Sequence, residues 1–563
     1  MRYAKLYTTH HTCRCLTFVR RAMLLALVGL VLSVQGSFGR NIFILPDRSW
    51  AISGDTIWFL ISTAAENQRE GNVVHVQLET SGNELIARTM VLIDQGMARG
   101  HLVVPNALAT GGYWLKAHQK GGAIPETQSV SARLINVYHR FDEMDTLPES
   151  PAISPTNIAP VAELLELRVE APTVKRREAL TIQVDIPAEV RHSLRHLTLS
   201  GGYADPAGRP ESNFFSHVER IDRHTSLPPE NDGFYIEGRV TSEVTLPDRV
   251  LVLLTVPGSA FHFDYYLTNS NGYFRFKLSK TYGTAELLIR VVSAEDGEFG
   301  IELLTPLENA AMLSTTDDSP APHEFVRQLK SMREADQFAR IFAGEVDPRE
   351  PFFSMEPVYP YPFYGRPDRR VIPAEFIDLP NFLEISRELL PAVRFRQRAG
   401  GFQLQVLDEL ERKFFDHSPL RLINGIPVFD DNLLYRFRSS DIAYIDLVYR
   451  ERIFGDLSFK GIVAIVLNSD DRSWLSEEKN LFVFTVPALQ PTIEQSAQLL
   501  KKDQPSELPD FRRVLLFETI DKEKAQQEFT INISDLKGTV VVRLEGVTHQ
   551  NEPFSIFRKI TVE

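Results

Sequence analysis

Short runs of β-branched and aromatic residues recur along most of this 563-residue chain, separated by turn-forming residues. Five such runs lie between residues 40 and 140: Thr56–Ser62, Val73–Leu78, Leu85–Leu92, Gly100–Val104 and Tyr113–His118. Gly, Asn, Asp and Pro stand between them, which is the spacing of an antiparallel β-sandwich. A chain of this length, with 43% hydrophobic residues, is too long for one core. We therefore expect a mainly β protein of about three to five domains.

Changes in this pattern divide the chain into segments. Residues 141–160 are rich in proline and read as a linker, and His323–Phe342 has the apolar period of a helix, with Phe325, Leu329, Met332, Phe338 and Ile341 on one side. Ala374–Leu390 is also helix-like and stops before Pro391. The predicted order is a β-sandwich at 40–140, a linker at 141–160, a second β module at 161–232, a β-sandwich at 233–306, a helix and a Pro/aromatic linker at 307–369, a mixed α/β domain at 370–475 and a C-terminal β module at 476–563.

The N-terminus reads as a secretory signal peptide at residues 1–39. Arg14, Arg20 and Arg21 precede the apolar run Met23–Val34, and small residues follow at 37–39. The run is shorter than the about 20 residues that a spanning helix needs. We therefore predict export and cleavage, with an uncleaved N-terminal anchor as the alternative.

Cleavage after residue 39 would change the charge and cysteine content. Five basic residues and no acidic ones would leave, so the net charge would move from −13 to −18. This acidity argues against nucleic acid and anionic lipid surfaces as partners. Cys13 and Cys15 would leave as well, so the mature chain would have no thiol, disulfide or cysteine-bound metal. Neither cysteine lies where a lipoprotein signal needs one, and no later stretch reaches transmembrane length.

Two segments of the first predicted sandwich carry a family resemblance. Leu45–Ser49 (LPDRS) with Ser53–Phe59 (SGDTIWF) resembles the opening of a macroglobulin-type β-sandwich, and Thr110–Ala117 (TGGYWLKA) is similar to a later strand of that domain. Such domains occur in alpha-2-macroglobulin-like proteins and in large exported proteins of Bacteroidetes. Trp58 and Phe59 should point to opposite faces of their strand. A generic sandwich is the alternative.

Two further regions resemble other exported domains. Glu237–Val240 (EGRV) and Thr268–Phe276 (TNSNGYFRF) are similar to a carboxypeptidase-regulatory-like sandwich. Pro419–Val428 (PLRLINGIPV), Ser440–Val448 (SDIAYIDLV) and Lys460–Ile465 (KGIVAI) resemble the plug of a TonB-dependent receptor. The residues after 470 are too few for a receptor barrel of about 22 strands. The resemblance thus implies a plug-like α/β domain without a barrel, and no transport.

Candidate catalytic residues do not form a recognisable constellation. The thioester of alpha-2-macroglobulins needs a cysteine that the mature chain would lack. His192 and His196 have zinc-ligand spacing only on a helix, and we expect a turn and a strand there. His323-Glu324 lacks a second histidine. The pairs Asp430-Asp431 and Asp470-Asp471 follow strands and are typical of solvated turns. We expect no catalytic site, no cofactor and no metal.

One aromatic segment stands out as a candidate partner-binding site. Tyr359, Tyr361, Phe363 and Tyr364 alternate with prolines in the run 355–367, and such rings are able to dock a partner. The alternative, which we favour, is that this loop packs its rings against neighbouring parts of the same chain.

Taken together, these patterns predict tandem antiparallel β-sandwiches of the macroglobulin or immunoglobulin-like kind plus one plug-like α/β domain. The predicted function is a non-enzymatic cell-envelope protein that binds or scaffolds an envelope or outer-membrane protein. It would reside in the periplasm or at the outer membrane of a Bacteroidetes-like bacterium. The alternatives are a glycan- or peptide-binding module in nutrient capture and a hydrolase with an unrecognised site.

Overall fold

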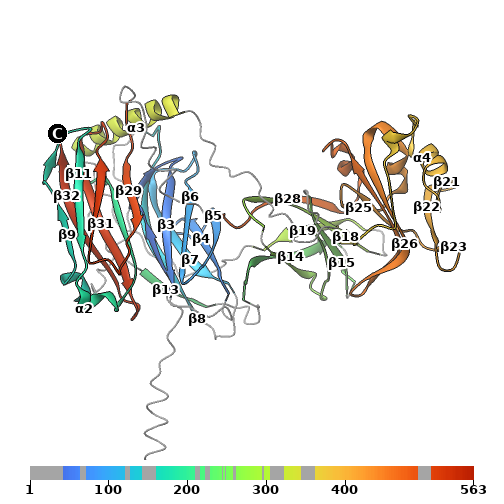
Figure 1. Cartoon of the computed structure of the whole chain (residues 1–563), viewed down its shortest axis with the longest axis horizontal. Coiled ribbons are helices and arrows are strands. Elements are labelled where there is room, and N and C mark those ends of the chain that lie inside the picture. The colour runs from blue at the N-terminus through green and yellow to red at the C-terminus, as the bar shows by residue number, and fades with distance from the viewer. Residues whose placement is uncertain are drawn as a thin grey trace, which may run out of the picture.

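Four β-rich domains follow one another along the long axis of the molecule (Figure 1). The computed structural model describes residues 42–63, 71–120, 127–142, 160–208, 216–221, 229–243, 245–247, 249–257, 262–279, 281–293, 297–304, 323–343, 362–491 and 509–563. The predicted signal peptide at 1–39 lies outside this part of the chain. The fold is mainly β with several sandwiched sheets, as predicted.

The first sandwich contains sheets of order β1-β3-β6 and β13-β8-β7-β4-β5, and β2 pairs with β8. Its strands are β1 Ile42–Pro46, β2 Trp50–Ile52, β3 Thr56–Thr63, β4 Val73–Glu79, β5 Leu85–Leu92, β6 Met97–Val103, β7 Gly111–Gln119, β8 Thr127–Tyr138 and β13 Ser216–Ile221. All five strands predicted for this region are present. Phe59 packs between the sheets, whereas Trp58 packs in a separate cluster with Phe517. The two rings therefore point to opposite faces, as expected.

The split sandwich is built from two distant parts of the chain. Its sheets have the orders β10-β32-β31-β12-β29 and β30-β11-β9. Its elements are η2 Pro160–Glu163, β9 Glu166–Val169, β10 Thr173–Val174, β11 Ala179–Asp185, α2 Ala188–Arg191, β12 Leu194–Tyr203, β29 Val514–Thr519, β30 Gln526–Asn532, β31 Gly538–Thr548 and β32 Pro553–Val562. The predicted modules 161–232 and 476–563 are thus not separate: β12 lies between β31 and β29, and neither part alone completes a sheet.

The inserted sandwich contains sheets of order β17-β14-β19 and β16-β15-β18-β28. Its strands are β14 Gly233–Ser242, β15 Leu251–Val256, β16 His262–Leu267, β17 Tyr273–Ser279, β18 Thr284–Val292, β19 Phe299–Leu303 and β28 Leu481–Pro487. β28 falls in the predicted C-terminal module but pairs with β18 instead. Residues 269–272 form a turn, in which the amide of Gly272 donates to the carbonyl oxygen of Asn269 at 2.9 Å. Glycine is required at 272 because φ is 72° and because a Cβ would lie 2.5 Å from the carbonyl oxygen of Val240.

The distal domain, residues 362–480, lies at the far end of the array (Figure 1). Its sheets have the orders β20-β26-β27-β24-β25 and β21-β22-β23. Its elements are β20 Arg369–Val371, η3 Pro373–Glu375, α4 Phe382–Glu388, β21 Val393–Arg398, β22 Gly401–Asp408, β23 Lys413–Phe414, β24 Leu420–Ile423, β25 Ile426–Val428, η4 Asp431–Arg436, η5 Ser439–Asp441, β26 Ile442–Phe454, β27 Leu457–Leu467 and η6 Ser473–Glu477.

The helix predicted over 374–390 is shorter than expected. Only α4 is α-helical, because Pro380 disfavours helical backbone before it and Asn381 caps the helix by accepting a hydrogen bond from the amide of Glu384 at 3.0 Å.

The predicted helix at 323–342 is present as α3, His323–Ala343, and it lies over the split sandwich (Figure 1). Leu329 and Met332 pack in the core of that sandwich. Phe338, predicted on the same side, is 53% exposed and lies beside Phe511 at a ring distance of 6.5 Å. Among the described residues, we find no helix that combines the length and the apolar character needed to cross a membrane.

The domains are nested in sequence. The chain begins the split sandwich, adds β13 to the first sandwich and builds most of the inserted sandwich. It then packs α3 on the split sandwich and builds the distal domain. Finally, β28 completes the inserted sandwich and β29 to β32 complete the split sandwich. Each junction also shares core residues: Leu288 of β18 packs in the distal core, Met90 of β5 in the inserted core and Tyr138 of β8 in the split core. The domains therefore pack as one continuous array.

Candidate functional site

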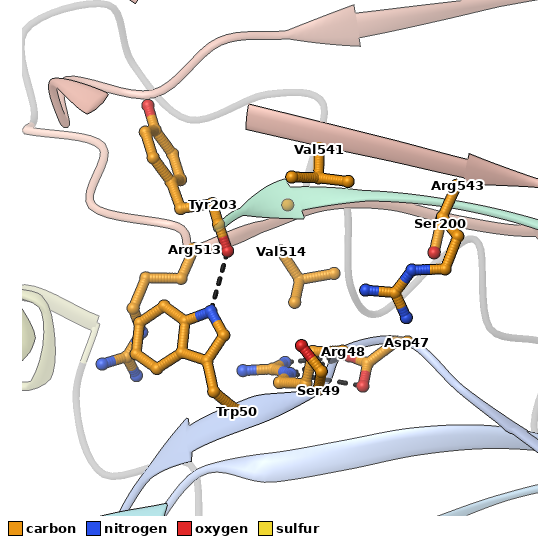
Figure 2. Close-up of a pocket in the computed structure, with 11 residues that line it drawn as sticks. Asp47, Arg48, Ser49, Trp50, Ser200, Tyr203, Arg513, Val514, Val541 and Arg543 are labelled. Atoms are coloured by element: carbon orange, nitrogen blue, oxygen red, sulfur yellow. Dashed lines mark hydrogen bonds and ion pairs between the residues drawn. The ribbon is translucent and has the colours of Figure 1, made fainter. Parts of the chain in front are cut away.

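A polar pocket lies between the first sandwich and the split sandwich (Figure 2). The first sandwich contributes the loop between β1 and β2, and the split sandwich contributes β12, β29, β31 and the residue before β29. The pocket is lined by Asp47, Arg48, Ser49, Trp50, Ser200, Gly202, Tyr203, Arg513, Val514, Val541 and Arg543.

The motif formed by Leu45–Ser49 and Ser53–Phe59 supplies one side of this pocket. Asp47 accepts hydrogen bonds from Arg48, at 2.9 Å from Nη2, and from the backbone amide of Trp58 at 3.2 Å. Asp55 accepts a bond from the amide of Ile52 at 2.9 Å and lies 3.4 Å from Arg48. The motif therefore closes the loop between β1 and β3 and orients a guanidinium towards the split sandwich.

Arg513 supplies the opposite side. It forms ion pairs with Asp55 of the first sandwich and, at 3.0 Å, with Asp336 of α3. The indole Nε1 of Trp50 donates to the carbonyl oxygen of Tyr203 at 2.8 Å (Figure 2). One arginine thus connects two sandwiches and a helix.

The pocket is lined by several charged side chains and two serines. Ser49 and Ser200 line it, but no histidine does, and a serine nucleophile needs an adjacent base. Burial raises the pKa of Asp47, while the neighbouring Arg48 opposes that shift. Because the carboxylates and guanidiniums here bind one another, the geometry holds domains together rather than presenting a reactive group.

Each of the three domain junctions contains a buried ion pair. Arg133 and Glu545 join the first and split sandwiches at 2.7 Å. Lys120 and Glu237 join the first and inserted sandwiches. Arg290 of β18 pairs with Glu478, which follows η6 in the distal domain. A buried pair is costly unless its partners are aligned, so these contacts favour one relative orientation of the domains.

The distal domain carries most of the exposed apolar surface. Of thirteen large apolar side chains that are exposed among the described residues, seven belong to it. Phe376 and Ile377, in the segment between η3 and α4, are 55% and 70% exposed. The seven are Ile372, Phe376, Ile377, Leu410, Phe429, Tyr435 and Ile453. Of these, Phe376 and Ile377 are neighbours in the chain, and adjacent exposed apolar groups are typical of an interaction surface.

The predicted aromatic site is partly within the described residues. Tyr364 is buried, and its hydroxyl donates to Asp446 at 3.0 Å; burial and this carboxylate raise its pKa. Phe363 stacks on Phe263 of the inserted sandwich at 4.5 Å. These two rings therefore contact their own chain. Tyr359 and Tyr361 lie outside the described residues, and their role stays a prediction.

The histidines and aspartates that were considered as possible metal ligands or acid–base groups do not come together at one site. His192 is exposed after α2, while the Nδ1 of His196 lies 2.8 Å from the hydroxyl of Ser62. Asp430 caps η4, and Asp431 pairs with Arg421 at 3.1 Å. The side chain of Asp471 accepts from the amide of Ser473. Among the described residues, no group of three or more His, Cys, Asp or Glu is placed to hold a metal ion.

No local sequence pattern identifies Arg513, Asp336 or the exposed pair Phe376-Ile377 as site residues. The first two belong to a site only through long-range contacts, since Arg513 lies 458 positions from Asp55 and 177 positions from Asp336. Phe376 and Ile377 lie in the stretch 374–390, which was predicted as a helix. Pro380, four residues after Phe376, is the local signal against that helix, because proline disfavours helical backbone in the residue before it.

Comparison with known proteins gives structural neighbours only. No protein family model matches the chain, and no curated protein sequence does. A trypsin-activated alpha-2-macroglobulin from Escherichia coli aligns at 9% identity and a TM-score of 0.22, covering 93% of this chain and 42% of its own. A Salmonella alpha-2-macroglobulin aligns at 9% and 0.22, covering 93% and 39%. The Yersinia pseudotuberculosis adhesin InvE aligns at 12% and 0.13, covering 48% and 60%. The chain thus spans about two fifths of the length of these macroglobulins.

Proposed function

We propose that this protein is a non-enzymatic, exported scaffold of the bacterial cell envelope that binds a protein partner through its distal domain. The three sandwiches hold that domain at one end of an ordered array. Residues 1–39 support export, and the plug-like motifs of the distal domain favour an outer-membrane protein as partner.

The observation that carries this proposal is the concentration of exposed apolar side chains on the distal domain. Seven of the thirteen lie there, although it makes up well under half of the described residues, and only Phe141 lies on the first sandwich. Protein-binding surfaces expose apolar anchors of this kind, whereas scattered single residues need no explanation.

The buried ion pairs at the junctions support the scaffold part of the proposal. Removing one partner of such a pair costs about 3–5 kcal/mol, so each junction resists rearrangement. The pocket between the first and split sandwiches belongs to this framework, since Arg48 and Arg513 both bind carboxylates there.

The test is a pull-down from envelope extract with the full chain and two double variants. Phe376→Ser with Ile377→Ser should reduce recovery of a specific outer-membrane protein at least tenfold, because both anchors are lost. Phe141→Ser with Phe557→Ser, which removes two exposed phenylalanines from the other sandwiches, should leave recovery unchanged. Recovery of glycans without a protein, or a hydrolytic activity of the full chain, would contradict the proposal.

A further inference from the structure

The second sheet of the distal domain, β21-β22-β23, presents a row of arginines on its outer face. Arg394, Arg396 and Arg398 alternate along β21 with Val393 and Phe395, which pack inward. Pairing with β22 places Gln405 opposite Arg394 and Gln403 opposite Arg396. Because cross-strand partners share a face, three guanidiniums and two amides form one surface, here called the arginine face.

These three arginines differ from most others in their domain, although Arg412 and Arg452 also form no ion pair within the described residues. Arg370, Arg421 and Arg436 each form an ion pair with a carboxylate. Within the described residues, no ion pair is found for Arg394, Arg396 or Arg398. Arg396 and Arg398 are exposed, and the guanidinium of Arg394 lies 3.6 Å from the ring centroid of Phe414 on β23.

Unpaired arginines in this arrangement require a reason. Successive residues on one face of a strand lie about 7 Å apart, so the three positive charges repel one another. The chain carries a net charge of −13 and has many carboxylates available to pair with them. Three like charges kept in a row on an acidic protein point to an anionic ligand supplied from elsewhere.

A pocket continues the same face. Leu407 follows Gln405 on the outer side of β22 and lines an open pocket of about 270 Å³ together with Pro391, Ala392 and Tyr449. Asp368, Arg369 and Glu409 complete the lining. An apolar floor beside a row of guanidiniums fits one apolar side chain next to several acidic ones.

We infer that the arginine face binds an extended acidic segment of the partner polypeptide, with carboxylates at alternate residues. An extended segment presents alternate side chains at the same spacing of about 7 Å, so one carboxylate meets each guanidinium. Guanidinium–carboxylate contacts of this kind are bidentate and directional. The amides of Gln403 and Gln405 hydrogen-bond the same segment. This inference rests on the proposed function and names the chemistry of the partner.

An anionic membrane fits the same observations less well. A lipid surface is an extended plane of negative charge, so the net negative charge of the whole chain repels it. A peptide contacts only the arginine face, where the local charge is positive. The pocket of Leu407 and Tyr449 also lies in line with the strand, where a polypeptide places its next side chain.

The binding test uses the full chain and a fluorescent peptide of alternating glutamate and valine. Arg396→Gln with Arg398→Gln should weaken binding at least tenfold and flatten its dependence on salt. Arg387→Gln with Arg436→Gln is the matched control, since it removes two arginines of the same domain that pair with Glu384 and Glu477. This control should bind like the parent.

Three outcomes would overturn the inference: equal binding by both double variants, equal binding of a peptide with the same glutamates in one block, or arginine-dependent binding only to phosphatidylglycerol vesicles. In the pull-down, partner recovery that needs Phe376 and Ile377 but not Arg396 and Arg398 would overturn the inference and leave the proposed function standing. No specific recovery by the parent chain would overturn the proposed function itself.

Discussion

At the scale of single residues, buried polar groups hold the array together. Asp55 binds two arginines from different domains, Arg48 and Arg513. Asp446 is fully buried and accepts hydrogen bonds from Nε and Nη2 of Arg370 at 2.6 and 2.7 Å. Such carboxylates fix neighbouring elements in one arrangement, because moving either partner would leave a buried charge unpaired.

Buried histidines make the stability of the sandwiches depend on pH. Burial lowers the pKa of His101 to about 4, and of His196 also to about 4, against 6.5 for an ordinary histidine. The unfolded chain therefore binds protons below pH 6.5 that the folded chain binds only near pH 4. The contribution of these two histidines to the free energy of unfolding is therefore fully present above pH 6.5, and it is lost as the pH drops towards 4.

Replacing His101 by phenylalanine should remove its part of this dependence. The phenyl ring keeps the contact with Trp58, whose ring centroid lies 4.9 Å away. Between pH 7 and pH 5 the parent chain should lose about 2 kcal/mol more of its unfolding free energy than the variant. Urea unfolding of both chains at the two pH values measures the difference, and equal losses would contradict it.

At the scale of elements, the sequence predicted strands well and their partners poorly. Val540–Glu545 and Leu197–Tyr203 are recognisable as strands from their own residues, and both are present in β31 and β12. Their pairing joins residues more than three hundred positions apart, such as Ser200 and Arg543, and no local pattern encodes that contact. The same holds for the site: Asp47 and Arg48 belong to one local motif, whereas no local pattern places Arg513 beside them. The alternating arginines of β21 were not among the predicted site residues, because no local pattern shows whether an arginine has a carboxylate partner.

β18 links two domains because its neighbouring residues face different cores. Leu287 packs in the inserted sandwich, and Leu288 packs in the distal domain. Leu288→Ala should cost about 2–5 kcal/mol and speed hydrogen exchange in β27 of the distal domain. Leu287→Ala is the control of equal chemistry and should speed exchange in β15 instead. Unchanged exchange in β27 after Leu288→Ala would show that the two domains open independently.

At the scale of the whole molecule, ordered junctions should make the domains unfold together. Glu545→Gln leaves Arg133 buried without its carboxylate and should destabilise the first–split junction by about 3–5 kcal/mol. Calorimetry should then resolve separate transitions for two sandwiches that unfold as one in the parent. Glu409→Gln breaks only an exposed pair with Arg450 and should change stability by less than about 1 kcal/mol. If Glu545→Gln still unfolds in a single calorimetric transition, the ion pair between Arg133 and Glu545 does not couple the unfolding of the two sandwiches.

The nested order of the domains also governs when each one is able to fold. During synthesis or passage through a membrane, β12 emerges long before β29 and β31, the strands on either side of it. Until β29 and β31 are available, both edges of β12 lack a partner strand, and such unpaired edges form hydrogen bonds readily with other chains. The distal domain, whose core lies almost wholly between Val371 and Leu481, meets no such delay. The distal domain should therefore mature before the split sandwich, so a holding chaperone would be needed for the split sandwich until β29 and β31 are available.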